Sequence, residues 1–374
     1  MEKIYLASPH MSDEEYERKY VKEAFDTNWL STIGENINEF EKAIQKYLGV
    51  KYSVGLSSGT SAIHLGLKAL DVKKDDIVFV SDLTFSASVN PIIYESATPV
   101  FIDSEYSTWN MSPEALKKAF TKYTPKAVVV VHLYGRAANM EEIVKICKEH
   151  NVPILEDAAE GLGTIYKGKF LGTYGECGAV SFNGNKIITT TSGGMLVSDN
   201  EEIVNKARFW STQSKDPARH YQHSQIGYNY RMSNVLAGIG RGQMQVLEDR
   251  IAKKKEIFDT YKEAFKNISD IEMMPEKEDE RSNYWLSTIT LKNESKVKPL
   301  DIIEALEREN IESRPVWKPM HLQPIFEKYD FINSNENGLS VGEDLFNRGV
   351  CLPSDTKMTI EQQNRVIKII KDLF

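Results

Sequence analysis

Short, almost continuously apolar runs alternate with helix-forming segments from about residue 50 onward. Four runs, at residues 77–80, 99–102, 127–131 and 152–155, consist almost entirely of apolar side chains. A strand of a parallel sheet that helices cover on both faces requires such a run, because neither of its faces meets water. Between the runs, residues 112–123 and 140–150 are predicted to be helices. This alternation predicts an α/β fold with a mostly parallel central sheet and helices on both faces.

The pattern changes near residue 233. A long, charged helical stretch runs to about residue 267, and a smaller α+β region follows it. There the pattern predicts strands near residues 284–291 and 311–317, and helices near 299–309 and from about 359 onward. We therefore expect two domains: an N-terminal arm and large domain over residues 1–245, and a linker helix and small domain over residues 246–374.

Composition and charge narrow the possible functions. With 41% hydrophobic and 27% charged residues the chain is an ordinary globular protein, and its net charge of −8 argues against nucleic-acid binding. The first residues lack the apolar core of a signal peptide, and no apolar run of about 18 residues exists, so we expect a cytoplasmic protein without a membrane segment. The three cysteines are far apart, and His220 and His223 have no acidic or cysteine neighbour, so we expect no metal site.

One lysine raises a question about chemistry. Lys186 stands between an Asn-Gly-Asn turn and the run Ile-Ile-Thr-Thr-Thr at residues 187–191, which favours extended structure. Taken alone, it is most simply a solvated lysine at the edge of a strand, where it would hinder pairing with other chains. Only partners elsewhere in the sequence can overturn that interpretation.

Three segments supply such partners. Residues 55–65 contain small side chains where a predicted strand is followed by a predicted helix, and backbone N–H groups at such a helix N-terminus can bind an anion. The alternative is that Ser58 or Thr60 only caps the helix. Asp157 and Glu160 follow a buried strand, where a carboxylate needs a cationic partner; a helix-capping box is the alternative. Phe85 follows the strand at 77–80 and reaches the same edge of the sheet, although core packing would also explain it.

Together these parts suit pyridoxal 5′-phosphate. The segment at 55–65 would hold the phosphate, and Phe85 would lie against the ring. Asp157 would keep the pyridine nitrogen protonated, and Lys186 would form a Schiff base with the aldehyde. The sequence therefore predicts Lys186 as the cofactor lysine.

Five motifs occur in order: Ser-Gly-Thr-Ser-Ala (58–62), Thr-Phe-Ser-Ala (84–87), Glu-Asp-Ala-Ala-Glu (156–160), Ser-Phe-Asn-Gly-Asn-Lys (181–186) and Gly-Tyr-Asn-Tyr-Arg-Met-Ser-Asn (227–234). In these, and over essentially its whole length, the sequence resembles the DegT/StrS nucleotide-sugar aminotransferases, a branch of the fold-type I pyridoxal-phosphate enzymes. The resemblance implies that Lys186 and Asp157 are catalytic, with Lys186 also shuttling protons. It implies cofactor contacts from Ser58, Gly59, Thr60, Phe85, Asp157, Glu160, Ser181, Asn183, Lys186 and Asn229. The asparagine would reach the phosphate of a neighbouring subunit, so the resemblance implies a homodimer with shared active sites.

Other segments resemble the family members that aminate UDP-linked 4-keto-6-deoxy-N-acetylglucosamine in bacillosamine and similar exopolysaccharide routes: residues 8–11, 28–30, 134–135, 311–321 and 351–354. The resemblance implies transfer of an amino group from L-glutamate to C4 of the sugar, with the cofactor alternating between its pyridoxal and pyridoxamine forms. It implies substrate contacts from His10, Asn28, Trp29, Leu30, Ser31, Arg231, Arg314, Trp317 and His321. Domain packing is the alternative for the two tryptophans. Ser-Thr-Ile at 31–33 and Thr-Ser at 191–192 depart from the pattern of these relatives.

Several rival functions conflict with particular positions. The one Gly-x-Gly, at residues 238–240, has Gln243 where a dinucleotide-binding motif needs glycine, so an oxidoreductase is rejected. Retention of Lys186, Asp157 and Glu160 argues against a non-catalytic regulator that binds the cofactor. A dehydratase of the family would carry histidine at position 186. A dTDP- or GDP-linked keto sugar is the alternative substrate.

Overall fold

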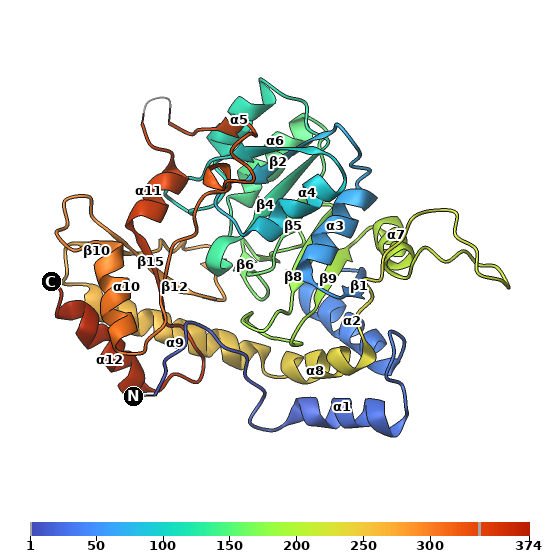
Figure 1. The fold of residues 1–374 in the computed structure, drawn as a ribbon, viewed down its shortest axis with the longest axis horizontal. Helices are drawn as coiled ribbons and strands as arrows, with labels where there is room; N and C mark the ends of the chain where they lie inside the picture. Colours follow the sequence, from blue (N-terminus) through green and yellow to red (C-terminus); the bar gives the residue numbers. More distant parts are fainter. Residues whose placement is uncertain (1, 336–337) are drawn as a thin grey trace.

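A computed structural model describes residues 2–335 and 338–374 of the chain, and an eight-stranded sheet forms the centre of its larger part (Figure 1). In spatial order the strands are β1 (Tyr52–Leu56), β9 (Gly194–Ser198), β8 (Cys177–Ser181), β5 (Ile154–Asp157), β4 (Ala127–Val131), β2 (Ile77–Ser81), β3 (Thr98–Ile102) and β14 (Phe331–Ile332). Neighbouring strands from β8 to β14 are parallel, whereas β9 is antiparallel to both β1 and β8. The mostly parallel sheet is the one that the apolar runs predicted.

Helices cover both faces of this sheet. Along β4, Ala127 and Val129 belong to the apolar cluster that includes α3 (Gly59–Ala69) and α7 (Glu201–Ser211). Val128 and Val130 belong to the opposite cluster, which includes α5 (Pro113–Phe120) and α6 (Met140–Glu149). Successive side chains of a strand point to opposite faces, and here both faces are buried, which explains the uninterrupted apolar runs. The short α4 (Asn90–Tyr94) also packs beside α3.

Four further helices surround this core. Near the N-terminus, α1 (Tyr16–Asp26) lies beside α8 (Asn234–Met244), and α2 (Glu35–Leu48) packs against both α8 and β1 (Figure 1). The long α9 (Leu247–Phe265) then runs from the large sheet to the smaller part of the molecule. The large domain is thereby joined to the rest of the chain by regular structure.

The smaller part is built on a four-stranded antiparallel sheet. Its order is β10 (Ile271–Met273), β12 (Ser287–Leu291), β15 (Gly349–Leu352) and β13 (Arg314–Pro315). It shares an apolar cluster with α9, α10 (Pro299–Arg308) and α12 (Ile360–Lys371), while α11 (Val341–Arg348) leads into β15. A second small sheet joins β11 (Glu280–Arg281), β6 (Ile165–Tyr166) and β7 (Lys169–Phe170).

Some predicted elements differ from the structure. The helical stretch from residue 233 is two helices, α8 and α9, because Gln245 and Val246 separate them. The strand predicted at 284–291 begins only at Ser287, since Tyr284 has a left-handed backbone (φ 51°). Of the strand predicted at 311–317, only Arg314–Pro315 form a strand, β13. Residues 187–191 form a loop: the Thr189 hydroxyl accepts the amide of Thr191, which offers the backbone an alternative to strand pairing.

Three segments cross the domain boundary predicted between residues 245 and 246, since β11 also pairs with β6. Strand β14, from the C-terminal third of the chain, pairs with β3 in the large sheet. Conversely, Ile4 bridges to Ile311 and packs in the apolar cluster of the small domain. The boundary itself stays a prediction, but each domain packs against a segment that belongs to the other part of the sequence. Within the described residues, none of the helices combines the length and the apolar character needed to cross a membrane.

Candidate active site

The predicted cofactor residues meet at one edge of the large sheet, where the parallel strands end. Strand β5 ends at Asp157, and β8, which pairs with it, ends at Ser181. Strand β1 ends at Leu56, just before α3. Lys186 lies in the loop that leaves β8. Motifs that are far apart in the sequence thus share one site, as ligand binding at the carboxyl ends of strands requires.

Lys186 is not a solvated residue. Its side chain is only 13% exposed, and its Nζ lies 3.3 Å from Oε1 of Glu160. On another side, Nζ lies 4.3 Å from the ring centroid of Trp285. The interpretation of Lys186 as a surface residue at a strand edge is therefore wrong.

Glu160 is a buried acid with an unusual pKa. Burial raises the pKa of its carboxyl to about 7, although the neighbouring Lys186 and the amide of Tyr134 both act to lower it. That amide donates to Oε2 at 2.8 Å and fixes the orientation of the carboxyl group. An acid that titrates near neutral pH, beside an amine, is suited to hold and release a proton.

Asp157 is held by hydrogen bonds at the end of β5. The Ser88 hydroxyl donates to its Oδ2 at 2.6 Å, and the amide of Ala159 donates to Oδ1 at 3.1 Å. Ser88 is itself within 2.7 Å of the Thr84 hydroxyl. Residues 159–163 form turns rather than a helix, so the capping-box alternative for Asp157 and Glu160 is wrong.

The N-terminus of α3 closely approaches the end of β8. Ser58 caps the helix, since its Oγ accepts the amide of Ser61 at 3.0 Å; capping is therefore confirmed there. A Cβ on Gly59 would lie 2.9 Å from the Cβ of Ser181, and a Cβ on Gly194 would lie 2.3 Å from the backbone of Ser58. Only glycines allow this approach, which leaves the helix N-terminus open to an anion.

Trp285, which contacts Lys186, is one of four neighbouring aromatic side chains, and we call Phe85, Tyr134, Trp285 and Trp317 the aromatic box. The ring centroid of Trp317 lies 5.7 Å from that of Phe85 and 5.4 Å from that of Tyr134. Trp285 lies 6.3 Å from Tyr134 and 6.5 Å from Trp317. Phe85 is 60% exposed, so its ring remains open to a ligand.

Comparison with known proteins identifies the family. The DegT/DnrJ/EryC1/StrS aminotransferase family matches residues 11–371. The chain belongs to this family. It is 51% identical to EpsN of Bacillus subtilis, described as a pyridoxal phosphate-dependent aminotransferase, over 100% of this chain and 96% of EpsN. It is 38% identical to a GDP-perosamine synthase of Escherichia coli, over 96% of this chain and 95% of the relative.

More distant relatives are also aminotransferases by name. A UDP-4-amino-4,6-dideoxy-N-acetyl-beta-L-altrosamine transaminase of Campylobacter jejuni is 30% identical over 92% of this chain and 90% of that protein. The crystal structure of a DegT DnrJ EryC1 StrS aminotransferase from Brucella abortus matches with a TM-score of 0.87 and 26% identity, over 96% of this chain and 95% of that one. The protein is thus a pyridoxal-phosphate-dependent aminotransferase with the fold-type I architecture that the sequence predicted.

The residues of this DegT/StrS-type site fit pyridoxal phosphate. The glycine-lined N-terminus of α3, with Ser181 opposite, suits the phosphate, and the buried carboxylate of Asp157 suits the pyridine nitrogen. Within the part of the chain that the structure describes, Lys186 is the lysine whose Nζ lies over a ring of the aromatic box. The amide of Asn183 donates to the Ser181 hydroxyl at 3.4 Å, so Asn183 borders the cradle; its cofactor contact stays a prediction. In the described ranges no cluster of three or more metal-ligating side chains occurs.

Two predicted substrate residues, Trp317 and His10, adjoin the aminotransferase site. Trp317 is part of the aromatic box, and Arg314 lies exposed on β13, three residues before it. His321 directs Nδ1 at Oδ2 of Asp82, 2.7 Å away; burial lowers the pKa of the imidazole, but the bond and charge of Asp82 raise it above its usual value. His10 lines a small cavity together with Lys186.

His10 is bound to a strongly acidic partner. Its Nε2 lies 2.5 Å from Oδ1 of Asp355. Although burial acts to raise the pKa of Asp355, hydrogen bonds from His10 and Ser8 lower it to about 2. The pair ties the N-terminal segment to the small domain beside the Lys186 loop.

Other predicted substrate residues lie elsewhere in the chain. Trp29 is 53% and Leu30 is 45% exposed. Trp29 lines a surface pocket beside α1 and α2 to which no residue of the aromatic box contributes. Asn28 adjoins it with a left-handed backbone, and the carbonyl of Ser31 accepts the amide of Asn234. Their contact with substrate stays a prediction.

Two residues of the 227–234 motif have partners within the chain. Arg231 donates to Glu41 and to the carbonyl of Gly55, each at 2.7 Å, so its guanidinium already holds the end of β1. Asn229 bridges to Thr212 in the loop between α7 and α8. A substrate contact for Arg231 and a cofactor contact across a dimer for Asn229 remain predictions.

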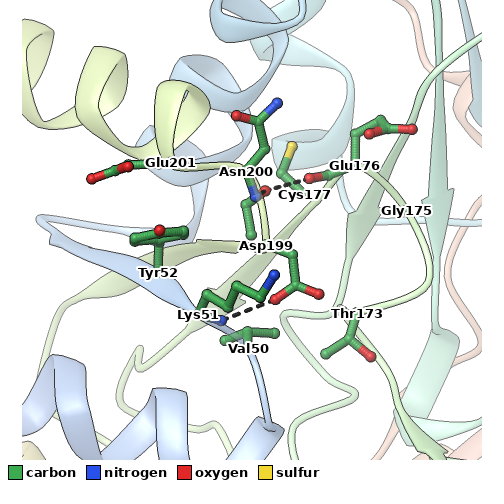
Figure 2. Close-up of a pocket in the computed structure, with 12 residues that line it drawn as sticks. Val50, Lys51, Tyr52, Thr173, Gly175, Glu176, Cys177, Asp199, Asn200 and Glu201 are labelled. Carbon is green, nitrogen blue, oxygen red and sulfur yellow. Dashed lines mark hydrogen bonds between the residues drawn. The ribbon is translucent and has the colours of Figure 1, made fainter.

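A second pocket lies at the opposite edge of the sheet (Figure 2). The starts of β1 and β8, the end of β9 and the N-terminus of α7 line it, and the amide of Lys51 donates to Asp199 there at 2.9 Å. None of the predicted site residues belongs to it.

Sequence reasoning missed the catalytic surroundings contributed by Trp285 and overlooked Tyr134 as a ring of the site. Trp285 was assigned only to a strand, and its contact partner Asn185 lies 100 positions away in the sequence. Periodicity reports local structure, so it carries no signal for such a contact.

Proposed function

We propose that this enzyme transfers the amino group of L-glutamate to C4 of a UDP-linked 4-keto-6-deoxy-N-acetylhexosamine. The product would be a UDP-4-amino sugar for glycan or polysaccharide biosynthesis. The observation that best supports amino transfer is the placement of Lys186: its Nζ lies between Glu160 and the ring of Trp285. This site is at the edge of the sheet where β5 ends with Asp157.

Bound pyridoxal phosphate supplies a carbonyl that accepts an amino group and a ring that accepts electrons. The chain supplies the rest. Asp157, buried and fixed by Ser88, would stabilise a positive charge on the ring nitrogen. Lys186 moves protons at the reacting carbon, with Glu160 3.3 Å away as its neighbour in proton exchange. The exposed ring of Phe85 offers an apolar face to a sugar ring.

The sugar-nucleotide assignment rests on two kinds of support. Trp317 and Phe85 present aromatic surface in the aromatic box, and Arg314 lies exposed three residues before Trp317 in the sequence, where a guanidinium can pair with a diphosphate. The sequence motifs and the Campylobacter jejuni relative favour a UDP-linked acetamido sugar.

A GDP-linked keto sugar is the second candidate. The GDP-perosamine synthase of Escherichia coli is 38% identical, which exceeds the 30% of the UDP-sugar transaminase. The two candidates differ in the base and in the acetamido group at C2 of the sugar, so one panel of substrates can separate them.

We also propose a cytoplasmic homodimer with shared active sites. Its support is the resemblance of the 227–234 segment to the DegT/StrS pattern, in which the counterpart of Asn229 reaches the phosphate of a neighbouring subunit. Within one chain, the carbonyl of Tyr230 accepts the amide of Ser57 at 2.7 Å, so the segment borders α3. The three cysteines are free and buried, which suits a reducing compartment.

The test is an assay of kcat/KM with glutamate and three substrates: UDP-4-keto-6-deoxy-N-acetylglucosamine, GDP-4-keto-6-deoxymannose and dTDP-4-keto-6-deoxyglucose. A preference for the first supports the proposal, and a preference for the second establishes the other candidate. Arg314→Ala should raise KM for the sugar nucleotide about 10-fold or more, because it removes a charged hydrogen bond to the substrate. The rate of the glutamate half-reaction should stay unchanged. Arg308→Ala, at the exposed end of α10, is the matched control. An equal loss in both half-reactions would contradict this role of Arg314.

A further inference from the structure

Trp285 contacts the Lys186 loop in two ways. Its indole N–H donates to the carbonyl of Asn185 at 2.7 Å, which fixes the peptide that precedes the lysine. Its ring centroid lies 4.3 Å from Nζ of Lys186, so the ammonium rests on the face of the indole. Both contacts come from the small domain, just before β12, whereas the lysine belongs to the large domain.

The backbone of Trp285 is itself tightly held. Its amide donates to Oδ1 of Asn283 at 2.9 Å, and its carbonyl accepts from Nζ of Lys254 at 2.9 Å. Lys254 is buried on α9, and its ammonium also donates to the carbonyl of Ser354. Trp285 is only 3% exposed, so its indole cannot move away from the lysine without breaking several contacts.

The same segment holds the other partner of Lys186. The side-chain amide of Asn283 donates to the carbonyl of Glu160 at 2.6 Å and to that of Leu162 at 2.9 Å. A Cβ on Gly135 would lie 1.9 Å from Oδ1 of Asn283, so this side chain lies tightly against the backbone. Residues 283–285 therefore set the placement of both Glu160 and Lys186.

We infer that Trp285 is a positioning residue for the catalytic lysine. It holds Nζ of Lys186 beside Glu160, and it makes this placement depend on the docking of the small domain. A lysine side chain has many rotamers, and small misplacements of a reacting group lower the rate strongly. The inference rests on the role of Lys186 in amino transfer and not on which sugar is the substrate.

Two variants separate the two contacts. Trp285→Phe keeps an aromatic face and loses the indole N–H, whereas Trp285→Leu loses both. Trp109→Phe is the matched control, because Trp109 is a similarly buried indole of the same apolar cluster, outside the Lys186 loop and the partners named above. The first readout needs no turnover: apoprotein is mixed with pyridoxal phosphate, the visible absorbance follows covalent attachment, and borohydride trapping with peptide mass spectrometry locates the adduct on Lys186. The second readout is the affinity for pyridoxamine phosphate, which binds without a covalent link to the lysine.

Trp285→Phe should slow attachment about 5-fold, and Trp285→Leu about 10- to 30-fold. The affinity for pyridoxamine phosphate should stay within about twofold of wild type, because the phosphate cradle and Asp157 are untouched. The saturating rate of the glutamate half-reaction should fall with the attachment rate, while the dissociation constant for glutamate stays unchanged. The inference is overturned if attachment in Trp285→Phe matches the Trp109→Phe control, or if the affinity for pyridoxamine phosphate falls in parallel with attachment. If Trp285→Leu does not fold, the result for Trp285→Phe alone tests the inference. If none of the three sugar nucleotides is a substrate, the inference about Trp285 is unaffected, because it does not depend on the sugar. If borohydride traps no adduct on Lys186 of the wild-type protein, the assignment of Lys186 as the cofactor lysine is wrong.

Discussion

Replacing Glu160 by glutamine should change how the stability of the cofactor-free protein depends on pH. Burial raises the pKa of this carboxyl from its usual 4.5 to about 7 in the folded protein. On unfolding the pKa returns to about 4.5. Because the pKa is higher in the folded state, the protonated acid stabilises the fold; this contribution is complete below about pH 4.5 and is lost as the pH rises through about 7.

These two pKa values determine the size of the effect. From about pH 5 to about pH 8 the free energy of unfolding should fall by about 2.5 kcal/mol through this group alone. Glutamine does not titrate, and it retains an acceptor for the amide of Tyr134. Relative to wild type, Glu160→Gln should therefore gain about 2.5 kcal/mol of stability over this range.

Urea unfolding of the apoproteins at several pH values measures this difference. Glu149→Gln, at the exposed end of α6, is the matched control and should follow the wild-type dependence on pH. If the difference between wild type and Glu160→Gln stays constant within about 0.5 kcal/mol across the range, the carboxyl is not a buried acid that titrates near neutral pH, and the reasoning fails.

Three further predictions concern the cofactor and the assembly. Lys186→Ala should lower turnover by at least ~10²–10⁴, because the proton shuttle is lost along with the covalent link, and glutamate should no longer shift the visible absorbance; turnover near the wild-type rate would refute its role. Asp157→Ala should weaken cofactor binding and slow proton transfer in the glutamate half-reaction without loss of the fold, as checked by cofactor titration, stopped-flow absorbance and circular dichroism; a saturated, fully active variant would exclude a partner role for this carboxylate. Light scattering should show a homodimer, and Asn229→Ala should lower the affinity for pyridoxal phosphate; a stable, active monomer contradicts shared sites.

The sequence predicted the central parallel strands of the sheet and the residues expected to contact the cofactor, whereas β8, β9 and β14 emerged only from the structure. Strands β2, β3 and β4 were predicted to within a residue or so, because their apolar runs reflect burial on both faces of the sheet. Lys186, Asp157 and the segment at α3 could be identified because each carries a distinctive residue type where an element begins or ends. The prediction failed where the backbone departs from regular dihedral angles, as at Tyr284, or where side chains satisfy the backbone, as at Thr189.

Tertiary structure decided the surroundings of these groups. The pKa of Glu160 depends on its burial beside Lys186, and neither property can be read from residues that are adjacent in the sequence. The indole of Trp285 reaches the lysine because the segment before β12, in the small domain, lies against the Lys186 loop of the large domain. Hydrophobic periodicity and motif spacing record what each segment does locally, so they identified the chemical groups. The distances between those groups are set by long-range packing, which only the folded chain specifies.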